Sequence, residues 1–395
     1  MSFDPVVSLL AAVLVLLIGT AVNRRVQLLS RYNIPDPITG GLLFAAVASV
    51  VLAVTDFRVV FDQSLKSVLL LMFFAGVGMC ADLRMLRQGG RALVVFLLVL
   101  LPFIAVQNAV GVGVARLLDL HPIFGLVAGS ITLVGGHGTG AAYAERFAEV
   151  NNLQAVMELS MTVATLGLII GGILAGPVAE YLIRRHGLRS TATAPATMDR
   201  AEAPVAISTV GMIGALAGIL VAVVAGRWLA SKFSGGSITI PAFLWCMLLG
   251  VALRNLVPFA GIRCDDRASD LISGVCLGLF LVMTMMALDL VDVARSAGPF
   301  MVILAAQVVV IALYAVVVCF RLMGRDYEAA VTSAAFIGFN MGSTATAMAN
   351  MQAITNKYGP APQSYLIVPL AGAFFIDVMN AILLTAALAL PFFGE

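Results

Sequence analysis

The stretch Gly135-Gly136-His137-Gly138-Thr139-Gly140 decides how this chain is interpreted, because four of its six residues are glycine. The preceding segment, 123–134, is mostly apolar but much shorter than the roughly 20 residues of a membrane-spanning helix. The following segment, 141–152, becomes polar. This pattern predicts a re-entrant hairpin that enters the membrane, turns at the glycines and returns, since irregular backbone at membrane depth must be buried in protein or line a cavity. The alternative is a surface loop between two short helices.

A second stretch repeats this pattern in the other half of the chain. Gly338-Phe339-Asn340-Met341-Gly342-Ser343-Thr344-Ala345-Thr346 follows the short apolar segment 329–337 and precedes a polar return. Ile34-Pro35 and Ile240-Pro241, which each open an apolar run, recur at nearly the same offset. The chain therefore reads as two weakly similar halves, each with one broken helix. Paired interrupted segments are typical of the binding sites of secondary transporters.

Composition places the chain in a lipid bilayer. It is 61% hydrophobic and 11% charged, whereas soluble domains carry about 25% charged residues. We expect an all-α polytopic membrane protein, because the apolar runs do not alternate as the strands of a membrane barrel do. A net charge of +2 without a basic stripe excludes nucleic acid as a partner. The five cysteines show no CxxC spacing and are predicted to be free thiols, so no cofactor is expected.

Ten membrane spans are predicted, five in each half. The first apolar run lacks a basic segment and a cleavage site, which indicates an uncleaved span and not a signal peptide. The predicted division is an N-terminal repeat (1–188), a linker (189–204) and a C-terminal repeat (205–395). The predicted spans are 5–22, 37–54, 65–80, 92–117, 153–183, 205–229, 240–256, 271–290, 299–322 and 363–393.

Basic residues orient these spans. With the N-terminus outside, the cytoplasmic loops hold 16 of the 23 lysines and arginines. Both termini are therefore predicted to be periplasmic and the linker cytoplasmic. Five spans per half is an odd number, so the second half is inverted relative to the first. The two glycine-rich tips then approach the midplane from opposite sides.

The chemistry of such tips comes from helix ends. N-terminal ends carry partial positive charge and favour anions, and C-terminal ends favour cations. Neither tip contains lysine or arginine, so an anion would rely on backbone N–H groups and hydroxyls. For each hydroxyl the alternative is a bond to its own helix. The candidate substrate-binding residues are Ser130, Thr132, Gly136, His137, Gly138, Thr139, Ser343, Thr344 and Thr346.

Asp377 and Asn380 are the strongest cation candidates, because ionisable residues inside spans are costly and they share a helix face. A carboxylate with an amide oxygen suits a small hard cation. We therefore predict that Asp377, Asn380 and Asn340 bind sodium, with Asp377 and Asn380 as the metal ligands; the alternative for Asp377 is a structural hydrogen bond. Glu158 is a weaker candidate, and one of Gln107 and Asn108 is expected to point inward.

Three groups of residues resemble the bacterial sodium/glutamate symporter family. They are 130–142 (SITLVGGHGTGAA), 345–355 (ATAMANMQAIT) and 372–380 (GAFFIDVMN), and 34–43 and 89–91 resemble it too. The likeness covers nearly the whole chain, and the linker matches poorly. It implies sodium-coupled uptake of glutamate across the inner membrane, two inverted five-helix repeats with opposed re-entrant loops, and a homodimer.

Three other functions remain as alternatives. The same architecture would serve another anionic substrate, such as a dicarboxylate or hydroxycarboxylate, because N–H groups and hydroxyls do not count carboxylates. A channel is disfavoured by two antiparallel halves. An enzyme or ATP-driven pump is disfavoured because the sequence contains no Gly-x4-Gly-Lys-Ser/Thr, HExxH or GxSxG motif.

Overall fold

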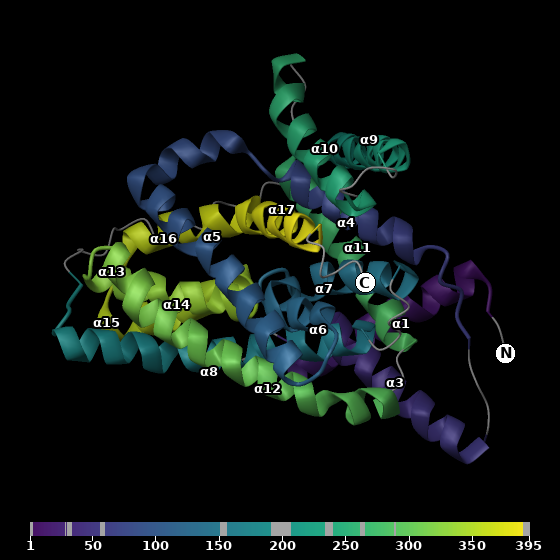
Figure 1. The fold of residues 1–395 in the computed structure, drawn as a ribbon. Coiled ribbons are helices and arrows are strands. Elements are labelled where there is room, and N and C mark those ends of the chain that lie inside the picture. The colour runs from purple at the N-terminus through teal and green to yellow at the C-terminus, as the bar shows by residue number, and fades with distance from the viewer. Residues whose placement is uncertain are drawn as a thin grey trace. The chain divides into compact units, whose positions relative to one another are not determined.

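The computed structural model describes residues 3–27, 29, 34–55, 60–150, 156–190, 207–233, 240–260, 265–287 and 290–389. These residues form helices (Figure 1). Most of the predicted linker lies outside them, as does Asp289, which the sequence pairs with Asp82 at the ends of corresponding spans. The linker's structure therefore stays untested.

Every predicted span has a helical counterpart; most bounds agree to within about six residues, but α12 begins nine residues before the predicted start at 299. Those of the first half are α1 (Pro5–Arg25), α3 (Asp36–Thr55), α4 (Lys66–Met79), α5 (Leu86–Leu117) and α8 (Val156–His186). Those of the second half are α9 (Thr209–Lys232), α10 (Ala242–Leu256), α11 (Asp266–Met286), α12 (Leu290–Tyr314) with η4 (Ala315–Cys319) and α13 (Phe320–Leu322), and α16 (Pro362–Leu370) with η5 (Ala371–Phe375) and α17 (Ile376–Leu388).

Length and apolar composition suffice for a membrane crossing in six of the described helices. These are Pro5–Arg25, Gly89–Leu117, Val156–His186, Thr209–Lys232, Asp266–Met286 and Gly298–Leu322. The remaining apolar helices are shorter, and Asp36–Val51, Lys66–Met79, Ala242–Leu256 and Ile376–Leu388 are among them. The all-helical membrane class is confirmed, whereas ten spans in two inverted repeats stay a prediction.

Side-chain caps explain where several helices begin. Asp4 accepts hydrogen bonds from the backbone N–H groups of Val6 (2.8 Å) and Val7 (3.1 Å), and proline opens the helix. Asp326 caps α14 in the same way through the N–H of Ala329 at 2.8 Å. Capping satisfies donors that have no partner within the helix. These caps fix the first residue of each element.

The chain forms two compact units, each of which takes segments from both halves. Unit 1 comprises Met1–Ala81, His137–Thr162 and Gly211–Gly298. Unit 2 comprises Asp82–Gly136, Val163–Val210 and Pro299–Glu395. Unit 1 thus contains α1, α3 and α4 with α9, α10 and α11, and unit 2 contains α5 and most of α8 with most of α12 and α14–α17. This division in space is distinct from the two predicted sequence repeats, which stay a prediction.

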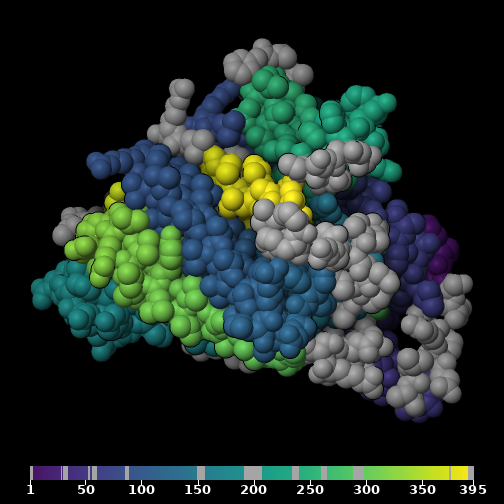
Figure 2. Space-filling view, viewed as in Figure 1, coloured from purple at the N-terminus to yellow at the C-terminus, as the bar shows by residue number. Residues whose placement is uncertain are grey.

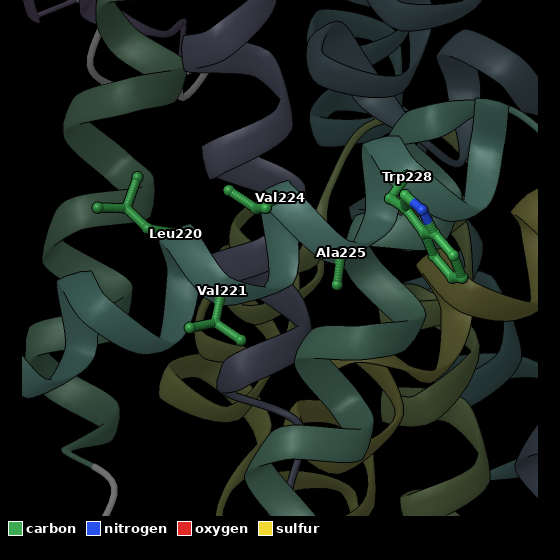
Figure 3. A pocket seen from close by; sticks show the side chains of 5 residues that line it. All are labelled: Leu220, Val221, Val224, Ala225 and Trp228. Carbon is green, nitrogen blue, oxygen red and sulfur yellow. The ribbon is translucent and has the colours of Figure 1, made fainter.

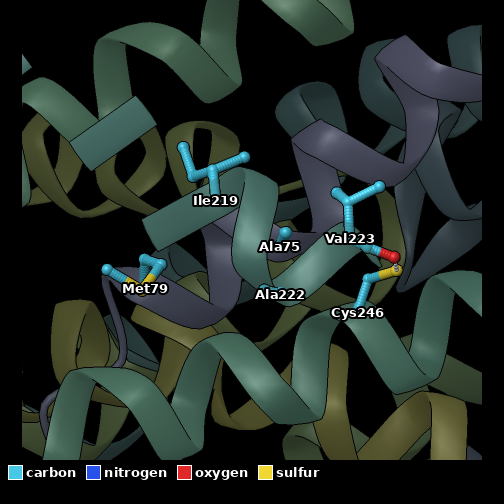
Figure 4. Close-up of a cluster of buried hydrophobic side chains, with 6 residues drawn as sticks. All are labelled: Ala75, Met79, Ile219, Ala222, Val223 and Cys246. Atoms are coloured by element: carbon cyan, nitrogen blue, oxygen red, sulfur yellow. Dashed lines mark hydrogen bonds between the residues drawn. The ribbon is translucent and has the colours of Figure 1, made fainter. Parts of the chain in front are cut away.

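The core of unit 1 joins helices from the two halves. Ala75 and Met79 of α4 pack against Ile219, Ala222 and Val223 of α9, and Cys246 of α10 completes the cluster (Figure 4). The thiol of Cys246 lies 3.9 Å from the carbonyl oxygen of Val223. Cys246, like Cys80, Cys276 and Cys319, is a free thiol, and Cys264 lies outside the described residues.

A polar network in unit 1 accounts for the Ile34-Pro35-Asp36-Pro37 motif. Asn23 of α1 donates to the carbonyl of Ile34 (2.9 Å) and to the carboxylate of Asp36 (2.7 Å). Thr20 donates to the same carboxylate at 2.7 Å, and Thr39 donates to the side-chain oxygen of Asn23 at 2.8 Å. The network stabilises the α1–α3 packing, because buried polar groups are favourable only when they are hydrogen-bonded.

One face of α9 is apolar and open. A shallow groove there is lined by Leu220, Val221, Val224, Ala225 and Trp228, all from this one helix (Figure 3). Val224 is 69% exposed and Trp228 is 59% exposed. Lipid tails solvate such a surface, which agrees with a membrane-embedded helix.

Unit 2 brings together the two interrupted segments. The first consists of α6 (Pro122–Leu126), η2 (Val127–Ile131) and the start of α7 (Gly136–Val150), and the second of α14 (Tyr327–Met341) and α15 (Thr344–Tyr358). On the face in Figure 2, α5 and α6 (blue), α12 (green) and α17 (yellow) lie next to one another. The rings of Phe124 on α6 and Phe300 on α12 meet edge to face at 5.4 Å.

Candidate functional site: two helix breaks in unit 2

The first break begins earlier than the sequence predicts. Gly129 has a non-helical conformation (φ −102°, ψ −133°) inside the π-helical segment η2, and Gly136 has φ +64°. A positive φ is strained for residues with a Cβ, so Gly136 needs glycine. His137, Gly138 and Thr139 lie in the first turn of α7. The expectation that these three form the irregular turn is therefore wrong: the helix restarts as soon as Gly136 has reversed the chain.

The second break is much shorter. α14 continues through Asn340 to Met341, and only Gly342 and Ser343 separate it from α15. The Ser343 side chain caps α15 by accepting from the N–H of Thr346 at 3.2 Å, and its hydroxyl lies 3.2 Å from that of Thr346. Because a serine cap satisfies the helix start, the chain needs just two non-helical residues here.

The two breaks meet inside unit 2. A Cβ placed on Gly136 would lie 3.6 Å from the carbonyl oxygen of Gly342. A Cβ on Gly167 of α8 would lie 2.5 Å from the carbonyl oxygen of Met341 and 2.7 Å from Cδ2 of Leu133. Gly167 thus lets α8 lie against both breaks at once, since any larger side chain would push them apart.

This geometry places helix ends of both polarities together. α15 starts at Thr344, so an N-terminal end with partial positive charge begins at the second break. α14 ends at Met341, which brings a C-terminal end with partial negative charge. An anion and a cation can therefore be bound side by side without a basic side chain.

The predicted hydroxyls divide by their partners. Thr132 donates to the carbonyl of Val127 in its own segment at 2.7 Å, which is the back-bonding alternative. Thr344 donates to the carbonyl of Gly372 in η5 at 3.3 Å. The Ser130 hydroxyl is fully buried and has no hydrogen-bond partner in the described part of the chain. Ser343 and Thr344 keep partial exposure, so they remain accessible at the start of α15.

Three of the candidates belong to unit 1. The boundary between the units falls between Gly136 and His137. His137 and Thr139 are buried, and a Cβ on Gly138 would lie 2.8 Å from Cε1 of Phe73. The structure thus groups Ser130, Thr132 and Gly136 with Ser343, Thr344 and Thr346, whereas His137, Gly138 and Thr139 are fixed within the other unit.

The cation candidates differ in burial. Asn380 is 1% exposed and donates from Nδ2 to the carbonyl of Ser130 at 3.0 Å, which joins α17 to the first break. Asn340 is fully buried, and its Nδ2 bonds the carbonyl of Phe336 at 2.8 Å. Asp377 is only partly buried, and no hydrogen bond to its carboxylate comes from the described residues. Asn340 and Asn380 therefore form one interior group that Asp377 does not join.

Gln307 was not predicted from the sequence, and only one of Gln107 and Asn108 was expected to point inward. Gln107 and Asn108 both point inward: Gln107 donates to the carbonyl of Asn340 at 2.9 Å, and Asn108 accepts from the N–H of Ser130 at 2.9 Å. Gln307 on α12 donates to the carbonyl of Gln107 at 2.8 Å. Its position 200 residues after Gln107, close to the offset between the two breaks, was the signal that could have found it.

Asp82 and Glu158 do not belong to the buried group around Ser130. Asp82 accepts a hydrogen bond from the N–H of Arg84 at 2.9 Å, as expected for a residue at a helix end. Glu158 lies in the first turn of α8, inside unit 1, so it does not belong to the group around Ser130. No group of three or more His, Cys, Asp or Glu side chains that could hold a metal ion occurs among the described residues.

An ion pair fixes the far end of the second break. Lys357, in the last turn of α15, donates to both carboxylate oxygens of Glu180 on α8 at 3.2 and 3.3 Å. This bond holds the pKa of Lys357 above its ordinary value. Arg184 pairs with the same carboxylate. α15 is thereby attached to α8 at its C-terminal end, while Asn350 bonds the carbonyl of Gly171 at 3.2 Å along its length.

Comparison with known proteins identifies the family. The family model described as sodium/glutamate symporter matches residues 1–360. The chain belongs to the sodium/glutamate symporter family. It is 40% identical over 99% of both chains to the sodium/glutamate symporter of Escherichia coli K12, and equally so to that of Shigella flexneri. Identity to the sodium/glutamate symporter of Haemophilus influenzae is 38% over 98% of each chain.

Membership in this family confirms the resemblance seen in the sequence. The protein is a multi-pass membrane transporter and not an enzyme. The two helix breaks thus lie in a chain whose relatives carry the name of a sodium-coupled carrier, which bears directly on what the breaks bind.

Proposed function

We propose that this protein is a secondary active transporter that imports glutamate together with sodium across the bacterial inner membrane by alternating access. The meeting of two helix breaks in unit 2 carries the proposal. Gly136 faces Gly342, and the start of α15 offers backbone N–H groups to an anion. The names and the 38–40% identity of the relatives support glutamate and sodium as the transported pair.

The substrate site comprises backbone and hydroxyl donors. In unit 2, Ser343 and Thr344 are partly exposed at the start of α15, and Gly136 is partly exposed at the first break. The N-terminus of α15 provides a partially positive end for a carboxylate of glutamate. In this proposal Thr346 and Thr132 shape the site.

The sodium site uses oxygens near the end of α14. Asn340 and Asn380 supply amide oxygens, and Asp377, one helical turn before Asn380, supplies negative charge. A sodium ion beside the substrate carboxylate offsets the repulsion between that carboxylate and Asp377. The coupling is reciprocal: sodium tightens glutamate binding by the same factor by which glutamate tightens sodium binding.

Uptake into proteoliposomes tests this function. The purified protein should accumulate labelled glutamate under an inward sodium gradient and fail to do so when potassium replaces sodium. Equal uptake in both salts would refute sodium coupling. Unlabelled dicarboxylates and hydroxycarboxylates serve as competitors, and stronger competition by one of them than by glutamate would favour the alternative anionic substrate.

The proposal includes an orientation and an assembly state. Both termini are periplasmic, the linker is cytoplasmic, and the protein is a homodimer. In a cysteine-free background, cysteines replacing Thr193 and Ser296 should be labelled from opposite sides, with position 193 labelled from the cytoplasm. Labelling from the same side would refute the inverted repeats, and a monomer mass in mild detergent would refute the dimer.

A further inference from the structure

Five almost fully buried residues of unit 2 each carry a side-chain oxygen that has no hydrogen-bond partner among the described residues. All five residues are at most 1% exposed. The atoms lie on α5, η2, α12, α14 and α17, and they are Gln107 Oε1, Ser130 Oγ, Gln307 Oε1, Asn340 Oδ1 and Asn380 Oδ1. A buried polar atom without a partner is costly, so such a concentration calls for a ligand that satisfies it.

The orientation of the amides is fixed by their nitrogens. Nδ2 of Asn380 donates to the carbonyl of Ser130, Nδ2 of Asn340 to that of Phe336, and Nε2 of Gln107 to that of Asn340. Flipping any of these amides would set two oxygens against each other without a proton between them. The oxygens of these amides are therefore left as acceptors without a protein donor among the described residues.

Four of the five oxygens belong to residues that converge on the helix breaks. The Ser130 carbonyl accepts from Asn380 at 3.0 Å and from the N–H of Gly135 at 3.1 Å. The next residue, Gly136, faces Gly342, which is two residues beyond Asn340. Gln107 belongs to this group because its side chain donates to the backbone carbonyl of Asn340. Gln307 contacts the group only through its hydrogen bond to the carbonyl of Gln107.

The chemistry of these ligands selects a monovalent hard cation. All are neutral oxygens, whereas protein sites for divalent calcium and magnesium include carboxylates. The C-terminal end of α14 adds partial negative charge. Ser130 also lies in the π-helical segment η2, and π segments interrupt α-helices preferentially at functional sites.

We propose that Ser130 Oγ, Asn340 Oδ1, Asn380 Oδ1 and Gln107 Oε1 together bind the coupling sodium ion. The inference rests on the proposed function and deepens it. In this site Ser130 is a sodium ligand and not a substrate-binding residue, and Gln107 is an additional ligand. Asp377 contributes negative charge near the ion without contacting it. Asp377 is partly exposed, whereas the four ligand residues are buried.

Ser130→Ala is the sharpest test, because it removes an oxygen that makes no hydrogen bond to the described residues. Asn340→Ala is a second variant on a different helix. The matched control is Ser333→Ala on α14: Ser333 is equally buried, but its hydroxyl bonds the carbonyl of Ala329 in its own helix at 2.8 Å. Sodium chloride is varied at constant ionic strength for each purified protein. The Tm is measured at each sodium concentration without glutamate, and glutamate uptake is then measured over the same concentrations.

We expect Ser130→Ala and Asn340→Ala to raise the half-saturating sodium concentration about tenfold or more in both assays, since each loses a ligand to a charged group. Ser333→Ala should keep the wild-type value, and calcium should not replace sodium as a stabiliser. If both ligand variants keep the wild-type value while wild-type uptake requires sodium, the site is refuted and the transport function stands. If wild-type uptake does not require sodium, the proposed function itself is refuted.

Discussion

Gly167 on α8 gives the most direct measure of how closely the two breaks must pack. A Cβ at this position would lie 2.5 Å from the backbone oxygen of Met341 and 2.7 Å from Leu133. Backbone atoms cannot move aside as a flexible side chain does, so the overpacking caused by Gly167→Ala should lower the free energy of unfolding by about 3 kcal/mol, at the upper end of the usual range. The higher helix propensity of alanine should raise it by about 1 kcal/mol. We therefore expect a net loss of about 2 kcal/mol in the free energy of unfolding.

Gly113→Ala is the matched control, because Gly113 lies in α5 of the same unit and a Cβ there has nothing within 4 Å. Gly113→Ala has the same gain in helix propensity without a clash, so the free energies of unfolding of the two variants should differ by about 3 kcal/mol. For units of about 200 residues this difference corresponds to about 6–12 °C in apparent Tm. Thermal unfolding in detergent measures it, with glutamate uptake as a second readout. Equal Tm values for the two variants would show that the breaks are not closely packed against α8.

Four other substitutions have defined outcomes. Gly136→Val should abolish uptake while membrane insertion persists, because φ is +64° there, and near-normal uptake would make this break a mere connector. Asp377→Asn should still fold but lose most concentrative uptake and much of its sodium dependence, and unchanged dependence would make Asp377 structural. Gly338→Ala should lower Tm, because its Cβ would lie 2.5 Å from the Cα of Ala347, and an unchanged Tm would contradict the close packing of α14 and α15. Lys357→Gln should leave the Tm nearly unchanged, because its pair with Glu180 is largely exposed, and a clear fall in Tm would show that this ion pair contributes measurably to stability.

The helices were predictable because apolar runs and caps are local signals. Asp4 with Pro5, and Asp326 before α14, mark their helix starts in the sequence itself. The π-helical segments η4 and η5 were not predicted: the sequence favours one continuous helix over 299–322 and another over 363–393. A π turn differs from an α turn by one residue of register, and hydrophobic periodicity does not resolve that difference over five residues.

The candidate site was predicted in part. Glycine content located both breaks, and intramembrane polarity pointed to Asn380 and Asn340. The predicted extent of the first break was wrong, because the glycine pattern does not show that α7 begins at Gly136. Gln107 and Gln307 are 200 residues apart, an offset close to that between the two breaks, but the hydrogen bond between them is seen only in the folded structure. The sequence also does not show that the Thr132 hydroxyl bonds the carbonyl of Val127 while the Ser130 hydroxyl has no partner among the described residues.

The π-helical segment η5 bears on how this chain tolerates insertions and deletions. Each residue of an α-helix turns the chain by about 100°, so deleting one residue from Ala371–Phe375 would rotate everything after it by that angle relative to α16. Asn380 would swing away from the carbonyl of Ser130, although no residue in contact had been changed. Length at this point is thus as constrained as residue identity: a one-residue gap in an alignment across 371–375 would mark a relative whose α17 presents a different face to the first break.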